Sequence, residues 1–452
     1  NMYLNVFIYK MFHASAEAIS AMVAASAAAA TITTLLIGAL SDKIGKRKLF
    51  ICMGYILWGI SIWGFAAIRM DVINALFPAA ASAASVGVAL VIILDCVMTF
   101  FGSSANDACF NAWLTDVTDH TDRGAAEGIN AMMPLVAILA VFGGFMSFDL
   151  GTPKSWTVIF CIIGLTVIVI GFLGLYLIKD PKIEVSGNRS YFANIFYGFR
   201  PSVVRENKML YFTLIALAVF NISIQVFMPY LILYYTESLG MDNYVLIFAP
   251  AILVSAIFTA LYGKVFDKRG FRAAILPTLA LLAAGYVGLY FCRGTALVFV
   301  FSLVMMCGYL GTGAMIGAQI RASTPQKKAG MFQGLRIVGQ VLIPGVIGPA
   351  IGAAVLQNAE TLVNTDGTTS FIPNENIFLA AFIAATAPKS SVFRNGKDII
   401  ITVAPYDFLK FHICHTPGSV SLRGGGSGTI IRIIFCCLVG VGIQIAVLCP
   451  DV

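Results

Sequence analysis

Two aspartates stand alone in one of the most apolar parts of the chain. Asp95 and Asp107 are the only charged residues between positions 82 and 114. A carboxylate in mid-membrane costs roughly 2.5 to 3.5 kcal/mol on insertion scales, so it usually faces a water-filled cavity or a partner. Either side chain can take up a proton, bind a cation or accept hydrogen bonds from hydroxyl groups. The alternatives are a structural hydrogen bond for Asp95 and a solvated helix end for Asp107.

Other polar residues follow these aspartates at helical spacing. Those on nearly the same face as Asp95 are Thr99, Ser103 and Asn106, and those on the adjoining face of Asp107 are Ser104, Asn111 and Thr115. Two polar faces on one apolar helix predict a wall in contact with water. We therefore assign five residues of this helix to solute or cation binding: Asp95, Thr99, Asn106, Asp107 and Asn111.

A second polar set lies between positions 209 and 235. Asn221 and Gln225 are one helical turn apart, and Tyr230 and Tyr234 follow Pro229. Amides hydrogen-bond hydroxyl groups without the cost of a charge, and tyrosines add a flat face and a hydroxyl. Contacts between helices and an aromatic belt at the membrane surface are the alternatives. We include all four in the candidate binding site.

The composition explains why isolated polar residues matter in this chain. Apolar residues make up 59% and charged residues only 11%, against about 25% charged in an ordinary soluble domain. The net charge of +7 is dispersed in short clusters between apolar segments, which excludes a nucleic-acid surface. The ten cysteines form no metal-type pair, and no phosphate-binding GxxxxGK[ST] motif occurs. We expect no enzyme activity, no metal and no cofactor beyond a coupling H⁺ or Na⁺.

The apolar segments are long enough to cross a membrane many times. Ten full spans are expected, with a half span at each end of the series, and together they indicate a twelve-helix all-α membrane protein whose helices 1 and 12 are incomplete. Eighteen basic residues fall in one set of loops and three in the other, so the first set is cytoplasmic. The expected full spans are 17–40, 49–68, 82–114, 129–148, 156–178, 209–235, 244–262, 272–291, 295–320 and 331–356.

One cytoplasmic loop occurs twice. Gly38, Asp42 and Gly45 reappear 225 residues later as Gly263, Asp267 and Gly270 with the same spacing. A loop repeated in two equivalent halves is typical of transporters built from parallel repeats. We expect it to act as a latch with Arg47 and Arg123, formed in one state and broken in the other. A simple positively charged anchor is the alternative, and Asp116 is expected in a solvated loop or an ion pair between the halves.

The motif "GALSDKIGKRK" at 38–48 resembles the cytoplasmic loop of the major facilitator superfamily, and the weaker "GKVFDKRGFR" resembles its counterpart in the second half. The resemblance extends from residue 1 to about 386 and implies two six-helix halves around a central cavity. Within the superfamily, "NDACFNAWLTDVTDHTDRG" at 106–124 is similar to helix four of the glycoside-pentoside-hexuronide cation symporters, the melibiose-permease-like branch. In that branch an aspartate in this segment contacts sugar, and Asp107 matches it.

The chain also departs from that branch. The branch binds its coupling cation with two aspartates in helix two, where this sequence has Ala30 and Thr34. It also has a lysine in helix eleven, for which the best match is Gln340. We therefore place Gln340 in the cavity, and we do not expect sodium coupling of the usual kind.

Four segments are expected. They are an N-terminal half at 1–178, a cytoplasmic linker at 179–208, a C-terminal half at 209–386 and an atypical tail at 387–452, which we interpret as non-native sequence because helix twelve stops halfway.

We predict a monomeric secondary active transporter in the bacterial cytoplasmic membrane, in contact with lipid and with no nucleic-acid partner. It would move a sugar or glycoside by cation- or proton-coupled alternating access. An exporter of amphipathic compounds or lipids and a nonfunctional truncated product are the alternatives.

Overall fold

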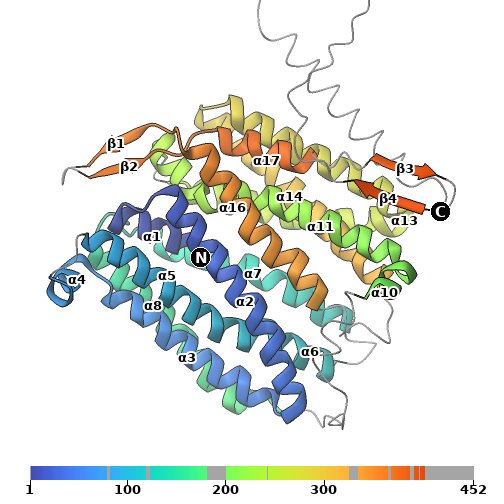
Figure 1. Ribbon diagram of the computed structural model, residues 1–452, viewed down its shortest axis with the longest axis horizontal. Helices are drawn as coiled ribbons and strands as arrows, with labels where there is room; N and C mark the ends of the chain where they lie inside the picture. The colour runs from blue at the N-terminus through green and yellow to red at the C-terminus, as the bar shows by residue number, and fades with distance from the viewer. Residues whose placement is uncertain are drawn as a thin grey trace, which may run out of the picture.

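The computed structural model describes residues 2–78, 82–118, 123–180, 200–241, 243–324, 334–364, 368–386, 391–395 and 398–402. The chain is almost entirely helical there, as the long apolar runs predict. The N-terminal helices form one bundle in blue to cyan, and the helices from α11 to α17 form another in green to orange (Figure 1). The helix α2 and the helix α16 run along the boundary between the bundles.

The first bundle contains eight described α-helices, of which α4 and α6 have only seven residues each, and a π-helical segment, η1. Their bounds are α1 Met2–Phe12, α2 Ala16–Ile44, α3 Arg47–Ala67, α4 Met70–Leu76, α5 Ala83–Gly102, η1 Ser103–Phe110, α6 Asn111–Val117, α7 Arg123–Phe145 and α8 Pro153–Leu177.

The second bundle has the same character, with two further π-helical segments, η4 and η6. Its elements are α10 Pro201–Glu206, α11 Lys208–Phe227, η3 Met228–Tyr230, α12 Leu231–Leu233, η4 Tyr234–Ser238, α13 Val245–Phe291, α14 Thr295–Ser323, η6 Val338–Leu342, α16 Ile343–Leu356 and α17 Asn376–Thr386.

Two antiparallel hairpins complete the described chain. β1 Thr361–Val363 pairs with β2 Thr369–Phe371 between α16 and α17, with Leu362 opposite Ser370. β3 Ser391–Asn395 pairs with β4 Asp398–Thr402. The rest of the predicted tail lies outside the described residues, as do residues 181–199 of the predicted linker at 179–208.

Within the described residues, nine helices are long and apolar enough to cross a membrane. They match nine of the ten expected spans. The tenth, 129–148, falls on α7, where only Val136–Phe145 can be assessed for its apolar character. The helix α17 has the half-span length expected for 376–386.

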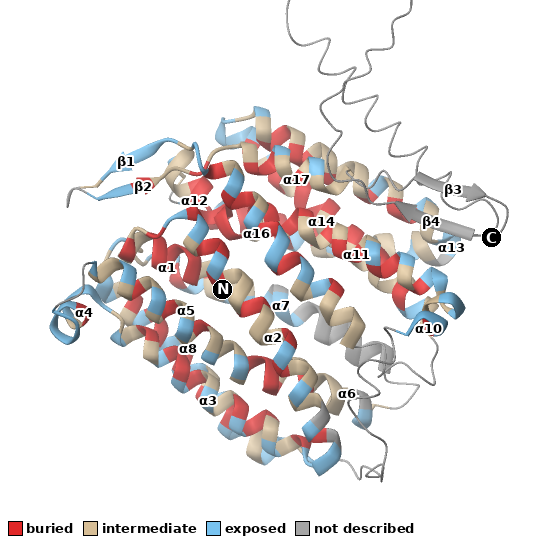
Figure 2. Cartoon of the chain, in the orientation of Figure 1, coloured by how far each residue is buried: buried red, intermediate tan, exposed pale blue. Residues whose placement is uncertain are grey.

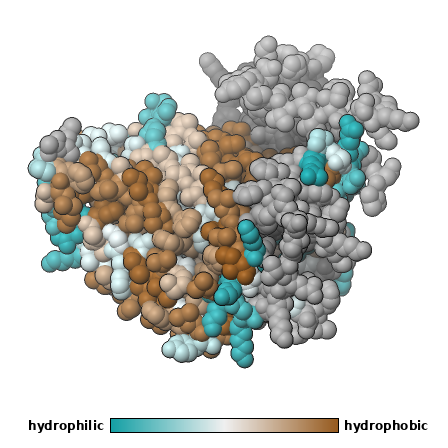
Figure 3. All heavy atoms as spheres, turned by 60° about the horizontal axis from the view of Figure 1, so that its bottom comes forward, coloured by the Kyte–Doolittle hydropathy of each residue, from teal (hydrophilic) through white to brown (hydrophobic). Residues whose placement is uncertain are grey.

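The outer surface of the bundles is apolar. Leucines such as Leu165 in α8 and Leu261 in α13 leave 53% and 63% of their surface exposed. Buried residues follow the inner faces of the helices (Figure 2), and broad hydrophobic patches, interrupted by pale and hydrophilic residues, lie on the coloured part of the surface (Figure 3). An apolar exterior around a packed interior is what lipid requires of a helical protein.

Both copies of the repeated loop end at a glycine with positive φ. Gly45 has φ 69° and ψ 17°, and its N–H donates to the Ser41 carbonyl at 2.8 Å, which ends α2. Gly270 has φ 76° and ψ 175° and marks the kink inside α13, near the start of its second span, Lys268–Phe291. Positive φ is readily adopted only by glycine. Both turns therefore depend on the glycine that closes each copy of the motif.

Small residues allow the halves to touch. A Cβ on Gly345 of α16 would lie 2.4 Å from the Cβ of Ala27 in α2. Lipid tails are as apolar as the helix surface, so the hydrophobic effect does not drive helices together in a membrane. Helices associate there through close packing at small residues such as these.

We expect Gly345→Val to destabilise the folded protein, because the new side chain would force α2 and α16 apart. Overpacking of this kind costs about 1 to 3 kcal/mol. Thermal unfolding of the detergent-purified protein measures the effect. Gly317→Ala in α14 is the control, since a Cβ there meets no atom within 4 Å. Equal melting temperatures for the two variants would show that the halves do not need this contact.

Candidate functional site: a cavity between the halves

A cavity of about 280 Å³ lies at the boundary between the two bundles. The first bundle provides most of its wall through α2, α3, α5 and η1. The second bundle contributes one residue each from α11, η6 and α16. The lining residues are Val23, Ser26, Ala27, Ala30, Trp58, Met98, Thr99, Gly102, Ser103, Asn106, Asp107, Gln225, Val341 and Gly345.

Asp107 is the only charged residue among the described residues that line this cavity. It lies in η1, whose wider turns are a frequent feature of functional sites. The Asn106 amide donates from Nδ2 to Oδ1 of Asp107 at 3.2 Å. The Tyr55 hydroxyl donates to Oδ1 of Asn106 at 3.4 Å. The pair is thereby oriented from the neighbouring helix α3, and the carboxylate keeps further acceptor sites.

An aromatic face lies next to this pair. Trp58 of α3 lines the cavity, and its ring centroid is 5.5 Å from that of Tyr55 at an angle of 55°. A Cβ on Gly102 of α5 would lie 3.0 Å from Cε2 of the indole. The indole therefore rests against bare backbone on α5. An aromatic face beside a carboxylate and an amide can bind a ring that carries hydroxyl groups.

Thr99 joins two helices at the cavity wall. Its hydroxyl is 2.8 Å from the Ser26 hydroxyl of α2, and both residues line the cavity. Asp95 is one turn earlier in α5, has no exposed surface and does not line the cavity. Neither of its oxygens has a hydrogen-bond partner among the described residues. Burial without a partner makes the charged form of a carboxyl costly, and protonation removes that charge. Asp95 is therefore suited to binding a proton.

Four of the ten predicted binding residues line the cavity: Thr99, Asn106, Asp107 and Gln225. Asn111 donates to the Asp107 carbonyl at 3.3 Å, so it supports the backbone of the wall. Asn221 and Tyr234 each have a buried polar atom without a partner among the described residues.

Tyr230 and Gln340 lie away from this cavity. Tyr230 is fully buried, and its hydroxyl donates to the carbonyls of Ala16 at 3.0 Å and Pro349 at 3.3 Å. It thus ties α2 to α16. Gln340 is exposed and accepts a hydrogen bond from Arg336 at 3.2 Å, while its neighbour Val341 lines the cavity.

Sequence reasoning did not assign Ser26 or Trp58 to the site, and it noted Ser103 only as part of a polar face. The chain has only four tryptophans, and Trp58 is in the middle of a span instead of at a membrane surface. That position could have drawn attention to it, because tryptophans in membrane proteins gather at the interfaces.

The cytoplasmic loop motif is held by an ion pair within the first half. Arg47 is buried, and its Nε is 2.5 Å from Oδ2 of Asp116, while Nη1 donates to the Ser41 hydroxyl at 3.1 Å. We expected Asp116 in a solvated loop or a pair between the halves; it pairs instead with an arginine of its own half, because α6 ends beside the turn at Gly45. The side chains of Asp42, Arg123 and Asp267 lie outside the described residues.

The opposite end of the boundary is closed by polar contacts between the halves. Lys10 of α1 is 2.6 Å from Glu237 of η4, and the Tyr9 hydroxyl donates to the Phe371 carbonyl at 2.6 Å. His13 Nδ1 is 3.1 Å from the Ser370 hydroxyl of β2. The distribution of basic residues predicts that this end is external. In this conformation the β1–β2 hairpin lies across the external end of α1.

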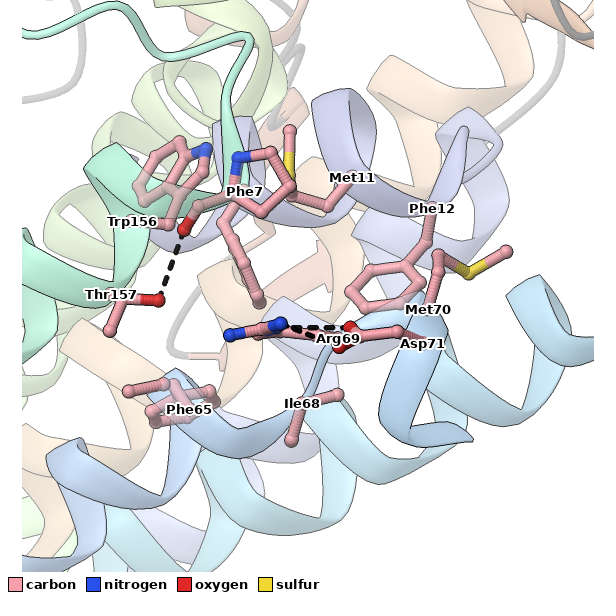
Figure 4. A pocket seen from close by; sticks show the side chains of 12 residues that line it. Phe7, Met11, Phe12, Phe65, Ile68, Arg69, Met70, Asp71, Trp156 and Thr157 are labelled. Atoms are coloured by element: carbon pink, nitrogen blue, oxygen red, sulfur yellow. Dashed lines mark hydrogen bonds and ion pairs between the residues drawn. The ribbon is translucent and has the colours of Figure 1, made fainter. Parts of the chain in front are cut away.

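A second, smaller pocket lies at the external end of the first bundle. Its volume is about 100 Å³, and Figure 4 shows aromatic side chains around it, among them Phe7, Phe65 and Trp156. Arg69 binds Asp71 at its rim through two hydrogen bonds of 3.0 and 2.5 Å, which lower the pKa of Asp71. Arg69 and Asp71 neutralise each other, so this pocket has few polar groups left to bind a polar solute.

The sequence model of the Major Facilitator Superfamily matches residues 1–357. The chain belongs to the major facilitator superfamily. Members of this superfamily are transporters and not enzymes, so the chain is a multi-pass membrane transporter. No curated protein matches the chain closely enough to be reported as a relative.

Solved structures with the same fold are distant in sequence. A single-residue mutant of the nucleoside transporter NupG has a TM-score of 0.60 at 12% identity, covering 85% of this chain and 92% of its own. The xylose transporter XylE from E. coli, in a partially occluded inward-open conformation, has a TM-score of 0.59 at 14% identity. The match covers 85% of this chain and 95% of XylE. A bacterial homologue of the human lysosomal transporter Spinster, in an inward-facing conformation, has a TM-score of 0.55 at 16% identity. The match covers 78% of this chain and 80% of the homologue.

The external closure can be tested by joining its two sides. We expect a disulfide between His13→Cys and Ser370→Cys to hold the external end shut, because the native side chains are in contact. In that background, an impermeant maleimide added from outside should label Ser26→Cys only after reduction. The same protein without Ser26→Cys is the control for native cysteines. Equal labelling in the oxidised and reduced states would exclude this end as the external gate.

We also expect Gly102→Val to displace the Trp58 indole from the cavity wall. The indole would move toward a different environment, so its fluorescence maximum should shift relative to the native protein. Trp58→Phe in the Gly102→Val background identifies which tryptophan reports the change. If the shift persists without Trp58, the contact between Gly102 and the indole does not position the ring.

Proposed function

We propose that this transporter moves a sugar or glycoside by proton- or cation-coupled alternating access. The observation that carries the proposal is the combination of Trp58, Asp107, Asn106 and Gln225 around one cavity between the halves. An aromatic face binds the apolar face of a sugar ring, and the carboxylate and amides bind its hydroxyls.

Two further observations support this assignment. Two of the structures that share the fold are of a nucleoside transporter and a xylose transporter, whose named substrates carry several hydroxyl groups. The helix-four segment at 106–124 resembles the glycoside-pentoside-hexuronide branch, and its sugar-contacting aspartate matches Asp107, which lines the cavity.

For coupling we favour a proton over sodium. Ala30 lines the cavity where the related branch has a carboxylate, and the Thr34 hydroxyl donates to the Ala30 carbonyl at 2.8 Å. Among the described residues, the carboxylates left in this region are Asp95 and Asp107. A proton needs a single carboxylate, whereas hard cations are bound by several oxygen ligands. Protonation of the fully buried Asp95 removes a charge from a low-dielectric site and so favours the occluded state, while Asp107 faces the solute in the cavity.

Uptake by vesicles that contain the full chain tests the proposal. A panel of labelled sugars is offered with and without imposed proton and sodium gradients. We expect accumulation of at least one sugar, driven by the proton gradient. Asp107→Asn should reduce uptake about tenfold or more, the order expected when a charge-assisted hydrogen bond of roughly 1.5 to 3 kcal/mol is lost. Asp95→Asn should abolish accumulation against a gradient while exchange continues.

Asp71→Asn is the matched control, since Asp71 is an exposed acid of the same half outside the cavity. No uptake of any sugar would defeat the proposed substrate class. Uptake that is unchanged in both the Asp95 and Asp107 variants would defeat the assignment of these residues.

A further inference from the structure

The charge of the cavity limits the solutes that it can hold. Among the described residues that line it, Asp107 is the only ionisable side chain, and none of them is a lysine, arginine or histidine. The other polar groups of the wall are hydroxyls and amides, which carry no charge. At neutral pH the cavity therefore has a negative charge whenever Asp107 is ionised.

Two basic residues near the boundary, Lys10 and Arg47, are paired with carboxylates outside the cavity. Lys10 at the external end is 2.6 Å from Glu237. Arg47 at the cytoplasmic end is buried and 2.5 Å from Asp116. Each of these cations thus has a carboxylate of its own outside the cavity.

The bonds of Asp107 leave it ready to accept a proton-bearing group. Its Oδ1 receives the Asn106 amide, whose own oxygen is taken by the Tyr55 hydroxyl. The carboxylate also accepts from the Ser103 side chain. An ionised carboxylate has acceptor sites only, about four in all, so some remain for a solute. A solute that offers O–H or N–H groups can fill them, whereas a second carboxylate or a phosphate meets a like charge in a site of low dielectric.

Trp58 adds to this preference. The indole face carries negative electrostatic potential and attracts ammonium groups within about 6 Å of the ring. It lines the same cavity as Asp107 and rests against Gly102. The carboxylate and the ring face thus favour the same sign of charge on a bound solute.

We propose that this cavity selects neutral and cationic sugars, such as 2-amino sugars, and rejects uronates and sugar phosphates, with Asp107 as the residue that sets this selectivity. The proposal rests on the proposed function, because it names the class of sugar that the same site takes. It separates this chain from a carrier of hexuronides, a substrate class included in the name of the branch that its helix-four segment resembles.

Matched sugars that differ only in charge provide the test. The purified full-length protein is unfolded thermally in detergent with glucose, glucosamine or glucuronate, and with the corresponding galactose and methyl glycoside series. Ligand stabilisation gives Kd for each, since a ligand that binds only the folded state raises its stability with concentration. We expect Kd for the uronate to be at least about tenfold weaker than for its neutral partner, as like charges in a low-dielectric site require.

Asp107→Asn keeps the shape of the side chain and removes its charge. In this variant the difference between uronate and neutral sugar should shrink to less than about threefold, and any advantage of the amino sugar should disappear. Asp71→Asn should keep the native ratios, because Asp71 is exposed and outside the cavity. The ratio of Kd values is insensitive to a general loss of stability.

The outcomes separate this proposal from the one on which it rests. A uronate that binds as tightly as its neutral partner would overturn the charge selectivity and leave sugar transport standing. Native ratios that persist in Asp107→Asn would remove Asp107 as the determinant. An absence of stabilisation by any sugar of the panel would defeat the proposed function and this inference together.

Discussion

The absence of water in the hydrocarbon core governs this structure. Every backbone N–H and C=O must be bonded within the protein there, so the chain forms helices. Polar side chains are placed on the inner faces under the same constraint. Tyr230 illustrates it: its hydroxyl has no access to solvent and is bonded to carbonyls at Ala16 and Pro349, on helices of different halves. Other polar residues, among them Thr99, Asn106 and Gln225, line the cavity, where they can meet a solute.

The external closure is built from contacts that are individually weak. Lys10 and Glu237 keep 29% and 17% of their side-chain surface exposed, and partly exposed ion pairs contribute about 0 to 1 kcal/mol. The hydrogen bonds of Tyr9 and His13 to the β1–β2 hairpin each add about 0.5 to 1.5 kcal/mol. A closure of this strength keeps two conformations within a few kcal/mol of each other. A bound solute or proton can then shift the balance by binding one of them better.

The spans were predictable from sequence, and the details of the site only in part. Apolar length fixes a membrane helix almost without regard to its neighbours, and the repeated motif fixed the position of the turns at Gly45 and Gly270. The polar faces of helix four were read with a regular α-helical period, which separates Asn106 from Asp107. The π-helical segment η1 changes that period, and both residues line one wall. The position of Trp58 inside the cavity, and of Gln340 outside it, depends on which helices pack together. Residue spacing within a single helix does not contain that information.

The uneven distribution of polar groups around the cavity has a consequence for the transport cycle. The first half supplies the indole, the carboxylate and the hydroxyls, and the second supplies Gln225 with the nearly featureless Val341 and Gly345. A solute held in this way travels with the first half, and the second moves past it as a smooth wall. Most of its contacts are then the same whichever membrane face is open. Loading and release would occur with similar affinity, and the direction of net movement would be set by the concentrations of the solute and of the coupling ion on the two sides.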